Sequence, residues 1–362
     1  MYFCRLESAL EFYFMNFAQE IITWYLIHKR DLPWRESSDP YIIWLSEIIM
    51  QQTRVEQGMP YFKKFAEAYP TVADFASASE DEILKHWQGL GYYSRGRNMH
   101  YTAQRVMEEH AGYFPSNYDQ LLKLKGVGEY TAAAISSFSA NEAKAVVDGN
   151  VFRLLSRYFG VDTPINSSAG KKIFTSLANQ LIDKARAGIY NQAAMEFGSL
   201  QCKPAKPACP ACPLKPGCNA YATNRIDALP VKLSKQKIRD RYFNFVVAAT
   251  NKGILMQKRG AKDIWQNLYQ LPLFESLKPI NAYELLGDPD FINTFGNHAV
   301  IKTISAPVRH MLSHQRLHAQ FIEIDNFTHP EESQNGLFYA SGTDFGTLAQ
   351  PKLIFEFLGK FM

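Results

Sequence analysis

The sequence predicts a mainly α-helical body, followed by a smaller domain of mixed α+β structure. In residues 17–200, apolar residues recur at spacings of three and four, with frequent turn signals between them. Beyond residue 240 the pattern changes to short runs rich in Val, Ile, Phe and Tyr, which is typical of strands. We therefore assign a helical domain over 1–225, a linker over 226–240 and a second domain over 241–362.

Individual elements are marked by local signals. Asp39 before a proline is typical of a helix N-cap and predicts a helix over 41–53. Ser116 and Asp119 resemble a weak capping box ahead of a helix over 118–124. In the second domain, the pattern predicts a β-hairpin over 242–259 with its turn at 251–253, a helix over 280–287 and a strand over 318–324.

The composition is that of a folded, weakly basic protein. Of 362 residues, 46% are hydrophobic and 20% are charged, so the chain can form buried cores. The formal charge of +4 suits a nucleic-acid partner without requiring one. No apolar run is long enough to span a membrane, and the first 17 residues lack a signal-peptide pattern. We therefore expect an intracellular protein.

Four of the five cysteines are clustered with the spacing C-x6-C-x2-C-x5-C, and Cys4 stands alone. In a reducing compartment such clustering indicates metal ligation, and thiolates suit zinc or an iron–sulfur cluster. The spacing favours iron–sulfur, because only the middle pair forms the short knuckle of structural zinc sites. Zinc remains the alternative at this point. The four are Cys202, Cys209, Cys212 and Cys218.

Two segments are suited to lie against phosphate. The cysteine loop has no acidic residue over 201–226 but contains Lys203, Lys206, Lys215 and Arg225. In LKLKGVGEYTAAA (122–134), Gly126 and Gly128 bracket a tight turn between two predicted helices. Glycines there allow backbone N–H groups to approach a phosphate, and the next helix presents its positive N-terminal end. This pattern is typical of a helix-hairpin-helix, although GxG alone also occurs in simple turns between helices.

Two carboxylates are candidates for glycosidic-bond chemistry. Asp148 precedes a predicted helix, and the helix dipole and free N–H groups would hold such an N-cap carboxylate ionised. Glu47 has apolar neighbours; burial would raise its pKa and make it a proton donor near neutrality, whereas an exposed helical glutamate is the alternative. One protonated acid and one ionised carboxylate divide the work in glycosidic-bond cleavage.

Seven motifs occur in the order found in MutY-type adenine DNA glycosylases, a family of the helix-hairpin-helix superfamily that also contains endonuclease III. They are LPWR (32–35), WLSEIIMQQT (44–53), GLGYYSRGR (89–97), KGVGEYTAAA (125–134), VDGNVFRLLSR (147–157), NQAAMEFG (191–198) and the four-cysteine loop. The resemblance covers residues 17–225, and the second domain follows more weakly. It implies a two-lobed helical glycosylase domain with an iron–sulfur loop (202–218), followed by a smaller α+β domain of the Nudix or MutT type.

The resemblance implies roles for matching residues. Glu47 would protonate a flipped adenine at N7, Asp148 would stabilise or transiently attack the oxocarbenium ion, and Asn150 would orient the carboxylates or the water. The cluster would be one four-iron four-sulfur cluster held by the four cysteines, in place of zinc. The implied DNA-contacting residues are Arg30, Leu32, Trp34 and Gln192 around adenine, Gln52 and Tyr92 at the lesion pair, Thr53 and Leu90 in the same motifs, and Gly126 and Gly128 in the hairpin.

Tyr130 separates this sequence from the bifunctional members of the superfamily. Endonuclease III-like enzymes have a lysine at this position, which forms a Schiff base with the sugar and leads to strand cleavage. A phenol cannot form an imine. The resemblance therefore implies a monofunctional glycosylase that acts on adenine mispaired with 8-oxoguanine or guanine in double-stranded DNA.

The second domain resembles the family's MutT-like recognition module. It lacks the glutamate-rich metal box of Nudix pyrophosphatases, so nucleotide hydrolysis is not expected. The Phe-Ser-His triplet that recognises 8-oxoguanine in the family corresponds here to Leu312, Ser313 and His314. Leu312 cannot stack as an aromatic ring would. A second departure is Lys125, where many members have a proline that makes the hairpin more rigid.

The sequence leaves three other interpretations to be tested. A non-catalytic lesion-binding protein would need Glu47 or Asp148 to be replaced, and both are present. An endonuclease III-like lyase for oxidised pyrimidines is opposed by Tyr130 and by the additional domain. A structural zinc protein is excluded if the purified protein contains iron. We expect a monomeric, cytoplasmic enzyme associated with the nucleoid and without a membrane partner.

Overall fold

The structure is a computed structural model that describes residues 16–234, 238–312, 314–330 and 336–361. Its contacts divide the chain into two compact units. The first unit comprises Met1–Ser77 and Tyr101–Ser234, and the second comprises Ala78–His100 and Lys235–Met362. The second unit thus includes a helical segment, residues 78–100, whose grouping with the C-terminal sheet the sequence did not indicate. The two units are described separately.

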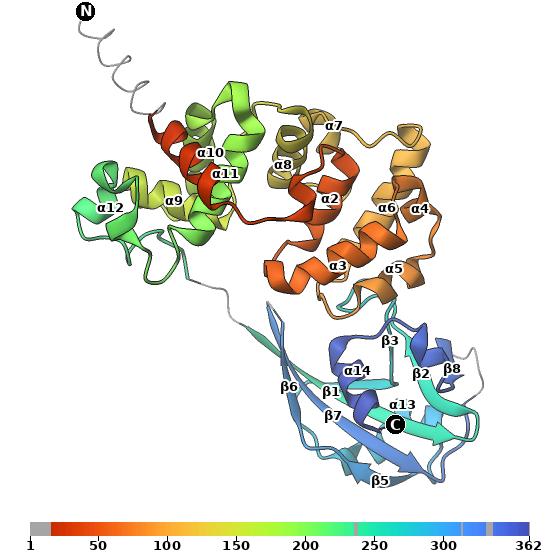
Figure 1. The fold of residues 1–362 in the computed structure, drawn as a ribbon. Helices are drawn as coiled ribbons and strands as arrows, with labels where there is room; N and C mark the ends of the chain where they lie inside the picture. The colour runs from red at the N-terminus through yellow and green to blue at the C-terminus, as the bar shows by residue number, and fades with distance from the viewer. Residues whose placement is uncertain (1–15, 235–237, 313, 331–335, 362) are drawn as a thin grey trace, which may run out of the picture. The chain divides into compact units, whose positions relative to one another are not determined.

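The first unit is helical and has two lobes (Figure 1). One lobe contains α2 (Pro40–Ile49), α3 (Val55–Ala68), α4 (Val72–Ser77), the later part of α6 (Ser94–Glu109), α7 (Tyr118–Leu121) and α8 (Glu129–Ala140). The other contains the helix at 16–28, α9 (Gly149–Phe159), α10 (Ser168–Leu181), α11 (Ala187–Leu200) and α12 (Asn219–Ala222). A continuous apolar core joins the helix at 16–28 to α9, α10 and α11, and three of the cysteines pack against it.

The helix starts test two of the local predictions. The Asp39 N-cap is confirmed, because its side chain accepts a hydrogen bond from the N–H of Tyr41 at 2.9 Å. The helix ends at Ile49, earlier than predicted, so that residues 50–53 form a turn. The capping box at Ser116 is wrong. Asn117 is the N-cap of α7, since its amide oxygen accepts from two free N–H groups of the first turn.

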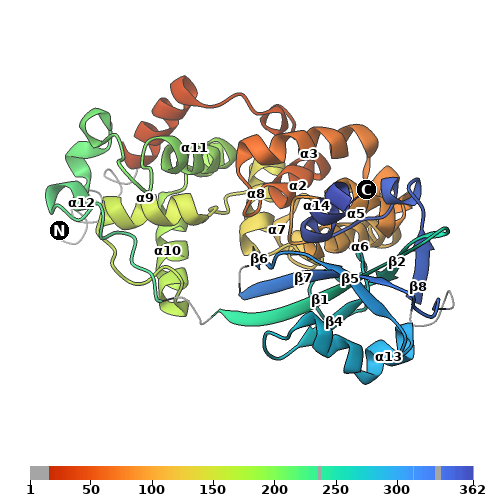
Figure 2. The ribbon, with the colours of Figure 1, turned by 90° about the horizontal axis from the view of Figure 1, so that it is seen from below.

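The second unit contains a mixed sheet (Figure 2). Strand β1 (Arg239–Thr250) runs parallel to β7 (Gln315–Asp325) and antiparallel to β2 (Gly253–Lys258) and β4 (Leu273–Ser276). The predicted hairpin is confirmed by the pairing of Thr250 with Gly253, and the predicted strand at 318–324 lies within β7. The remaining strands are β3 (Tyr269–Gln270), β5 (Val300–Ile304), β6 (Val308–Met311) and β8 (Leu337–Ala340).

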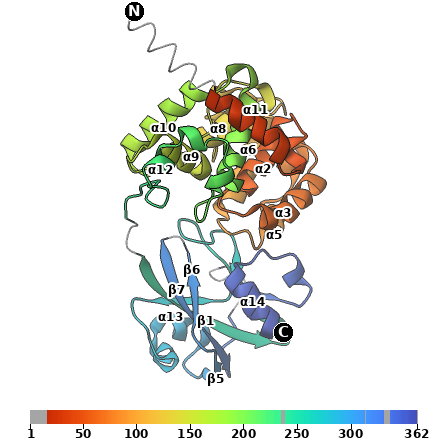
Figure 3. The ribbon, with the colours of Figure 1, turned by 60° about the vertical axis from the view of Figure 1, so that its left-hand side comes forward.

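Helices cover both faces of this sheet (Figure 3). On one face, Phe291 and Phe295 of α13 (Pro289–Phe295) join the core formed by alternate residues of β1 and β7. On the other face, the rings of Phe321 on β7 and Phe357 on α14 (Lys352–Phe361) stack with centroids 3.8 Å apart. The unit also includes α5 (Glu80–Trp87) and the beginning of α6.

The helix predicted over 280–287 is a 3-10 helix, Ala282–Gly287. Asn281 is its N-cap, and Asp288 and Pro289 then begin α13. A proline fixes the backbone at a first helical position and cannot donate within a continuing helix, which explains the break. Within the described part of the chain, no helix is both long enough and apolar enough to cross a membrane.

Candidate active site

A cavity of about 710 Å³ in the first unit, here called the excision cavity, contains the two candidate carboxylates. Glu47 lies on α2 with only 8% of its surface exposed. The hydroxyl of Tyr130, on α8, donates a hydrogen bond to Oε2 of Glu47 at 2.6 Å. Burial raises the pKa of Glu47 to about 7; the hydrogen bond from Tyr130 opposes this rise, and the nearby charge of Asp148 adds to it. Glu47 can therefore hold a proton near neutral pH.

Asp148 is the N-cap of α9. Its Oδ1 accepts hydrogen bonds from the N–H groups of Asn150 at 2.9 Å and Val151 at 2.8 Å, and its Oδ2 accepts one from Nδ2 of Asn150 at 2.7 Å. The sequence predicts that the helix terminus keeps this carboxyl ionised. Burial raises the pKa of Asp148 above its ordinary value, and the hydrogen bonds and the charge of Arg153 oppose that rise. The two carboxyls thus differ chiefly in how many donors surround them.

Arg153 connects this site to the cysteine loop, a link that the sequence analysis did not identify. Its guanidinium donates to Oδ1 of Asn150 at 2.9 Å, to the carbonyl of Gly198 at 2.5 Å and to the carbonyl of Cys202 at 2.7 Å. The helices are in close contact here. A Cβ on Gly198 would lie 2.7 Å from the Asn150 carbonyl oxygen and 2.8 Å from the Asn150 Cβ. Glycine at 198 therefore allows α11 to approach the start of α9.

The opposite wall of the excision cavity depends on a buried carboxylate, Glu196, which the sequence analysis also missed. Its side chain is 1% exposed and forms ion pairs with Arg30 at 2.7 Å and Arg35 at 2.8 Å. Burial acts to raise its pKa, but the hydrogen bonds from both arginines lower it to about 2. The only sequence signal for this role was its place within the motif at 191–198.

The residues predicted to surround adenine are only partly brought together. Arg30, Leu32 and Trp34 line the excision cavity beside Glu47. Gln192 lies one turn before Glu196 on α11 and is not among the lining residues; its Oε1 accepts a hydrogen bond from the Tyr25 hydroxyl. The structure therefore does not place Gln192 in the wall of the excision cavity.

Two residues predicted to insert at the lesion pair have unusual backbones. Gln52 has φ 55° and Tyr92 has φ 47°, in the left-handed region that residues other than glycine seldom adopt. Gln52 is exposed and, with Thr53, lies at the edge of the excision cavity. Tyr92 is 47% exposed and belongs to the second unit. Such strained positions persist where surrounding structure fixes them, and they are common at functional sites.

The predicted hairpin is present between α7 and α8. Gly126 has φ 82°, and Gly128 is the N-cap of α8 without a side-chain capping bond. A Cβ on Gly128 would meet nothing within 4 Å, so space remains beside the free N–H groups. The ammonium group of Lys125 lies 4.4 Å from the centre of the Tyr101 ring. The turn thus has free N–H donors at the start of α8 and a cation in Lys125.

The four clustered cysteines line one cavity, together with Arg157 and apolar side chains such as Phe197 and Leu214. One guanidinium nitrogen of Arg157 lies 3.5 Å from Sγ of Cys202. Burial raises the pKa of the Cys212 thiol to about 11. Over the described ranges, no group of three or more His, Cys, Asp or Glu side chains is placed to hold a metal ion. The donor chemistry, four soft sulfurs around a common cavity, nevertheless fits an iron–sulfur cluster.

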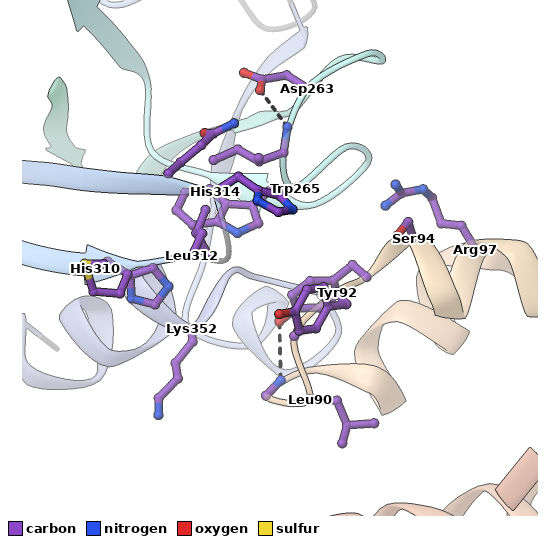
Figure 4. Close-up of a pocket in the computed structure, with 16 residues that line it drawn as sticks. Leu90, Tyr92, Ser94, Arg97, Asp263, Trp265, His310, Leu312, His314 and Lys352 are labelled. Carbon is purple, nitrogen blue, oxygen red and sulfur yellow. Dashed lines mark hydrogen bonds between the residues drawn. The ribbon is translucent and has the colours of Figure 1, made fainter. Parts of the chain in front are cut away.

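The second unit has a cavity of its own, of about 500 Å³, here called the recognition pocket. Figure 4 shows Leu90 and Tyr92 on one wall, and His310, Leu312 and His314 on the wall formed by the C-terminal part of the chain. Ser313 lies outside the described residues. Trp265, absent from the predicted site, also lines the pocket, and its ring lies edge-on to His310 with centroids 6.1 Å apart. Burial lowers the pKa of His310.

A buried acid beside an N-capping aspartate, with a glycine hairpin nearby, defines a base-excision glycosylase of the helix-hairpin-helix class. Residues 45–180 match the model of the HhH-GPD superfamily of base excision DNA repair proteins, and residues 244–360 match the NUDIX domain model. The chain belongs to the adenine DNA glycosylase family, and it is therefore a DNA glycosylase of base excision repair.

Individual relatives support this assignment. The chain is 34% identical over 303 residues to the adenine DNA glycosylase of Buchnera aphidicola subsp. Schizaphis graminum, covering 83% of this chain and 85% of that protein. It is 41% identical over 226 residues to the adenine DNA glycosylase of Rattus norvegicus, covering 59% of this chain and 44% of that protein. A solved endonuclease III–DNA complex has the same fold in the helical part, with a TM-score of 0.51, 22% identity and coverage of 59% of this chain and 97% of that chain.

Proposed function

We propose that the protein hydrolyses the N-glycosidic bond of adenine mispaired with 8-oxoguanine or guanine in double-stranded DNA, without cleaving the strand. The observation that supports this most directly is the Tyr130 hydroxyl bound to a buried Glu47 beside Asp148. It combines a protonated acid, a second carboxylate and a residue that cannot form a Schiff base in one cavity.

Glu47 supplies the proton in this proposal. Adenine leaves more readily when N7 is protonated, so the donor must still carry its proton near the pH at which the enzyme works. A carboxyl with a pKa of about 7 meets that requirement, whereas an exposed glutamate does not. The base must first leave the helical stack, and the cavity of about 710 Å³ has room for a flipped nucleotide.

Asp148 stabilises the positive charge that develops on the sugar. Its bonds from Asn150 and Val151 fix both carboxylate oxygens, so little reorganisation is needed as charge develops. Asn150 is itself held by Arg153 through its side-chain oxygen. Asn150 therefore positions Asp148 and takes no part in the proton transfer, which Glu47 carries out.

Recognition of the base opposite adenine is proposed for the recognition pocket. Leu312 offers no ring for stacking, but Tyr92 and Trp265 both line the same pocket and can provide aromatic surface. His314 supplies a hydrogen-bonding group there. The pocket thus retains stacking and polar recognition, although the aromatic rings come from other positions than in the family triplet.

Two further features bear on DNA binding and the cofactor. The glycine turn at 126–128 offers free N–H groups to a phosphate, and the solved endonuclease III of the same fold is bound to DNA. We propose that Cys202, Cys209, Cys212 and Cys218 hold a four-iron four-sulfur cluster. When bound, the cluster would order the basic loop at 202–218, which then faces the DNA backbone.

Base release from matched duplexes tests the proposal. Single-turnover reactions would use duplexes containing 8-oxoguanine:A, G:A, T:A or thymine glycol, each analysed with and without alkali. We expect adenine release from the first two only, with strand breaks appearing after alkali. Breaks without alkali, or a borohydride-trapped complex that Tyr130→Phe abolishes, would contradict the monofunctional assignment. Tight binding without release would make the protein a lesion sensor.

A further inference from the structure

The wall of the recognition pocket that contains Tyr92 follows α5, and residues of α5 outside the pocket hold it in place. Lys85 on α5 donates from Nζ to the backbone carbonyls of Phe345 at 2.9 Å and Leu348 at 3.0 Å. One turn earlier, Asp81 forms an ion pair with Lys258 at 2.9 Å. Asp81 and Lys85 do not line the pocket, so these contacts hold the helix that leads into the pocket wall.

A second set of contacts fixes the two ends of the turn. The side-chain oxygen of Gln88 accepts from the N–H of Gln350 at 3.0 Å, and the Tyr93 hydroxyl donates to the Gln350 carbonyl at 3.1 Å. On the far side, Arg97 donates to the carbonyl of Gln266 at 2.9 Å. The anchoring partners are next to the opposite wall, because Gln266 follows Trp265 and Gln350 lies two residues before Lys352.

The turn between these anchors is strained. Tyr92 has φ 47° although it is not a glycine, and a residue in that region stays there only when its surroundings fix it. Tyr92 is 47% exposed, so packing of its side chain alone does not fix this conformation. The contacts made by α5 and by Gln88 are therefore well placed to keep the turn in this conformation.

We propose that Asp81, Lys85 and Gln88, here called the clamp, are positioning residues for recognition of the base opposite adenine. They act by holding residues 89–93 against the C-terminal wall of the recognition pocket, and they touch neither DNA base nor reacting atoms. This inference rests on the proposed function of that pocket. Glu47 and Asp148 belong to the other unit, so loss of the clamp reduces discrimination between mispairs while the chemistry of excision continues.

Lys85→Met tests the clamp, because it keeps the length of the side chain and removes only the ammonium donor. Lys278→Met, at an exposed lysine of the same unit, is the matched control. We expect the ratio of single-turnover rates on 8-oxoguanine:A and G:A duplexes to fall about tenfold in Lys85→Met, as a displaced contact surface would cause. The G:A rate and the control's ratio should remain close to wild type.

A charge exchange separates positioning from general loss of structure. Asp81→Lys and Lys258→Asp should each lower the ratio about two- to threefold, as expected for an exposed ion pair. The double variant should restore most of it, although it lacks the hydrogen bond that the Tyr269 hydroxyl donates to Asp81 at 2.8 Å. These variants also decide the question if Lys85→Met fails to fold in a thermal melt. Failure of the double variant to restore the ratio would overturn the positioning role of Asp81.

Wild-type protein and His314→Ala distinguish failure of the clamp from failure of the proposed function. If wild type shows no preference for 8-oxoguanine:A over G:A, the proposed function of the pocket is wrong. If wild type has the preference, His314→Ala loses it and folded Lys85→Met keeps it, the pocket is correctly assigned and the clamp proposal is overturned.

Discussion

The excision cavity and the recognition pocket are built from different physical parts. In the excision cavity, titratable groups are buried and held by hydrogen bonds: Glu47 by Tyr130, and Glu196 by two arginines. The recognition pocket is formed largely by aromatic and apolar side chains from distant parts of the chain. Changing a single titrating group should therefore abolish function in the first site, whereas in the second small displacements of a wall should only reduce selectivity.

The largest effect that this contrast predicts is that of Glu47→Gln. The amide keeps the shape and can still accept from Tyr130, but it cannot donate a proton to the base. A general acid raises the reaction rate by about 10²- to 10⁴-fold. The rate of single-turnover adenine release should therefore fall by that factor, while duplex binding is retained. Strong residual release would remove Glu47 from the proton-donor role. Loss of binding as well would show that the two sites are less separate than proposed.

The same variant has a consequence for pH dependence. The folded-state pKa of Glu47 is raised from 4.5 to about 7, so the protonated form is the one favoured by folding. Its stabilising contribution is complete below pH 4.5 and is lost as pH rises through 7. Wild-type excision should decline above pH 7 as the donor loses its proton. Glu47→Gln should also be more stable than wild type at pH 8, and a melt at pH 5 and pH 8 checks the sign.

The contrast also explains what the sequence could predict. Glu47, Asp148 and the cysteines could be predicted as candidate site residues because each lies in a short motif whose chemistry depends on neighbours along the chain. The Asp39 cap and the 250–253 hairpin were predictable for the same reason. Glu196 and Arg153 were missed because their roles come from contacts between helices, and no spacing of residues records those contacts.

The recognition pocket shows more clearly what could not be predicted from the sequence. The pocket brings together Tyr92, Trp265 and His310 because residues 78–100 group with the C-terminal sheet, whereas the sequence places residues 78–100 in the helical domain. For Asp148, the N-cap geometry was predictable from the sequence, but the burial that raises its pKa was not. Local hydrogen bonds depend on residues that are close along the chain, whereas the desolvation of a carboxyl group depends on the whole fold.

Gly198→Ala should have the next largest effect, because it disturbs the excision cavity without changing a charged group. The added Cβ would lie 2.7 Å from a backbone oxygen and 2.8 Å from the Cβ of Asn150, so α11 or the start of α9 must move. Overpacking of this kind costs about 1–3 kcal/mol of stability. A displaced Asn150 should lower single-turnover excision by about 10- to 100-fold, given the sensitivity of catalysis to misplacement.

Gly359→Ala is the control for that substitution. Gly359 is an exposed glycine within α14, and an added Cβ there meets nothing within 4 Å. Alanine is favoured over glycine in a helix, so this variant should melt at or above the wild-type temperature with unchanged excision. If Gly198→Ala behaves like Gly359→Ala, the close approach of α11 to α9 is not needed for catalysis.

The smallest effect should come from Leu312→Phe, which tests the recognition pocket instead of the excision cavity. The substitution restores the aromatic residue of the family triplet in a pocket that already contains Tyr92 and Trp265. If those two rings already provide the stacking surface, the added ring should raise the preference for 8-oxoguanine:A over G:A by less than about threefold, well below the 1–3 kcal/mol of an unassisted stack.

A gain of tenfold or more would mean that Tyr92 and Trp265 do not compensate for Leu312. In that case Trp265→Leu should leave the wild-type preference unchanged, whereas it should lower the preference if the compensation is real.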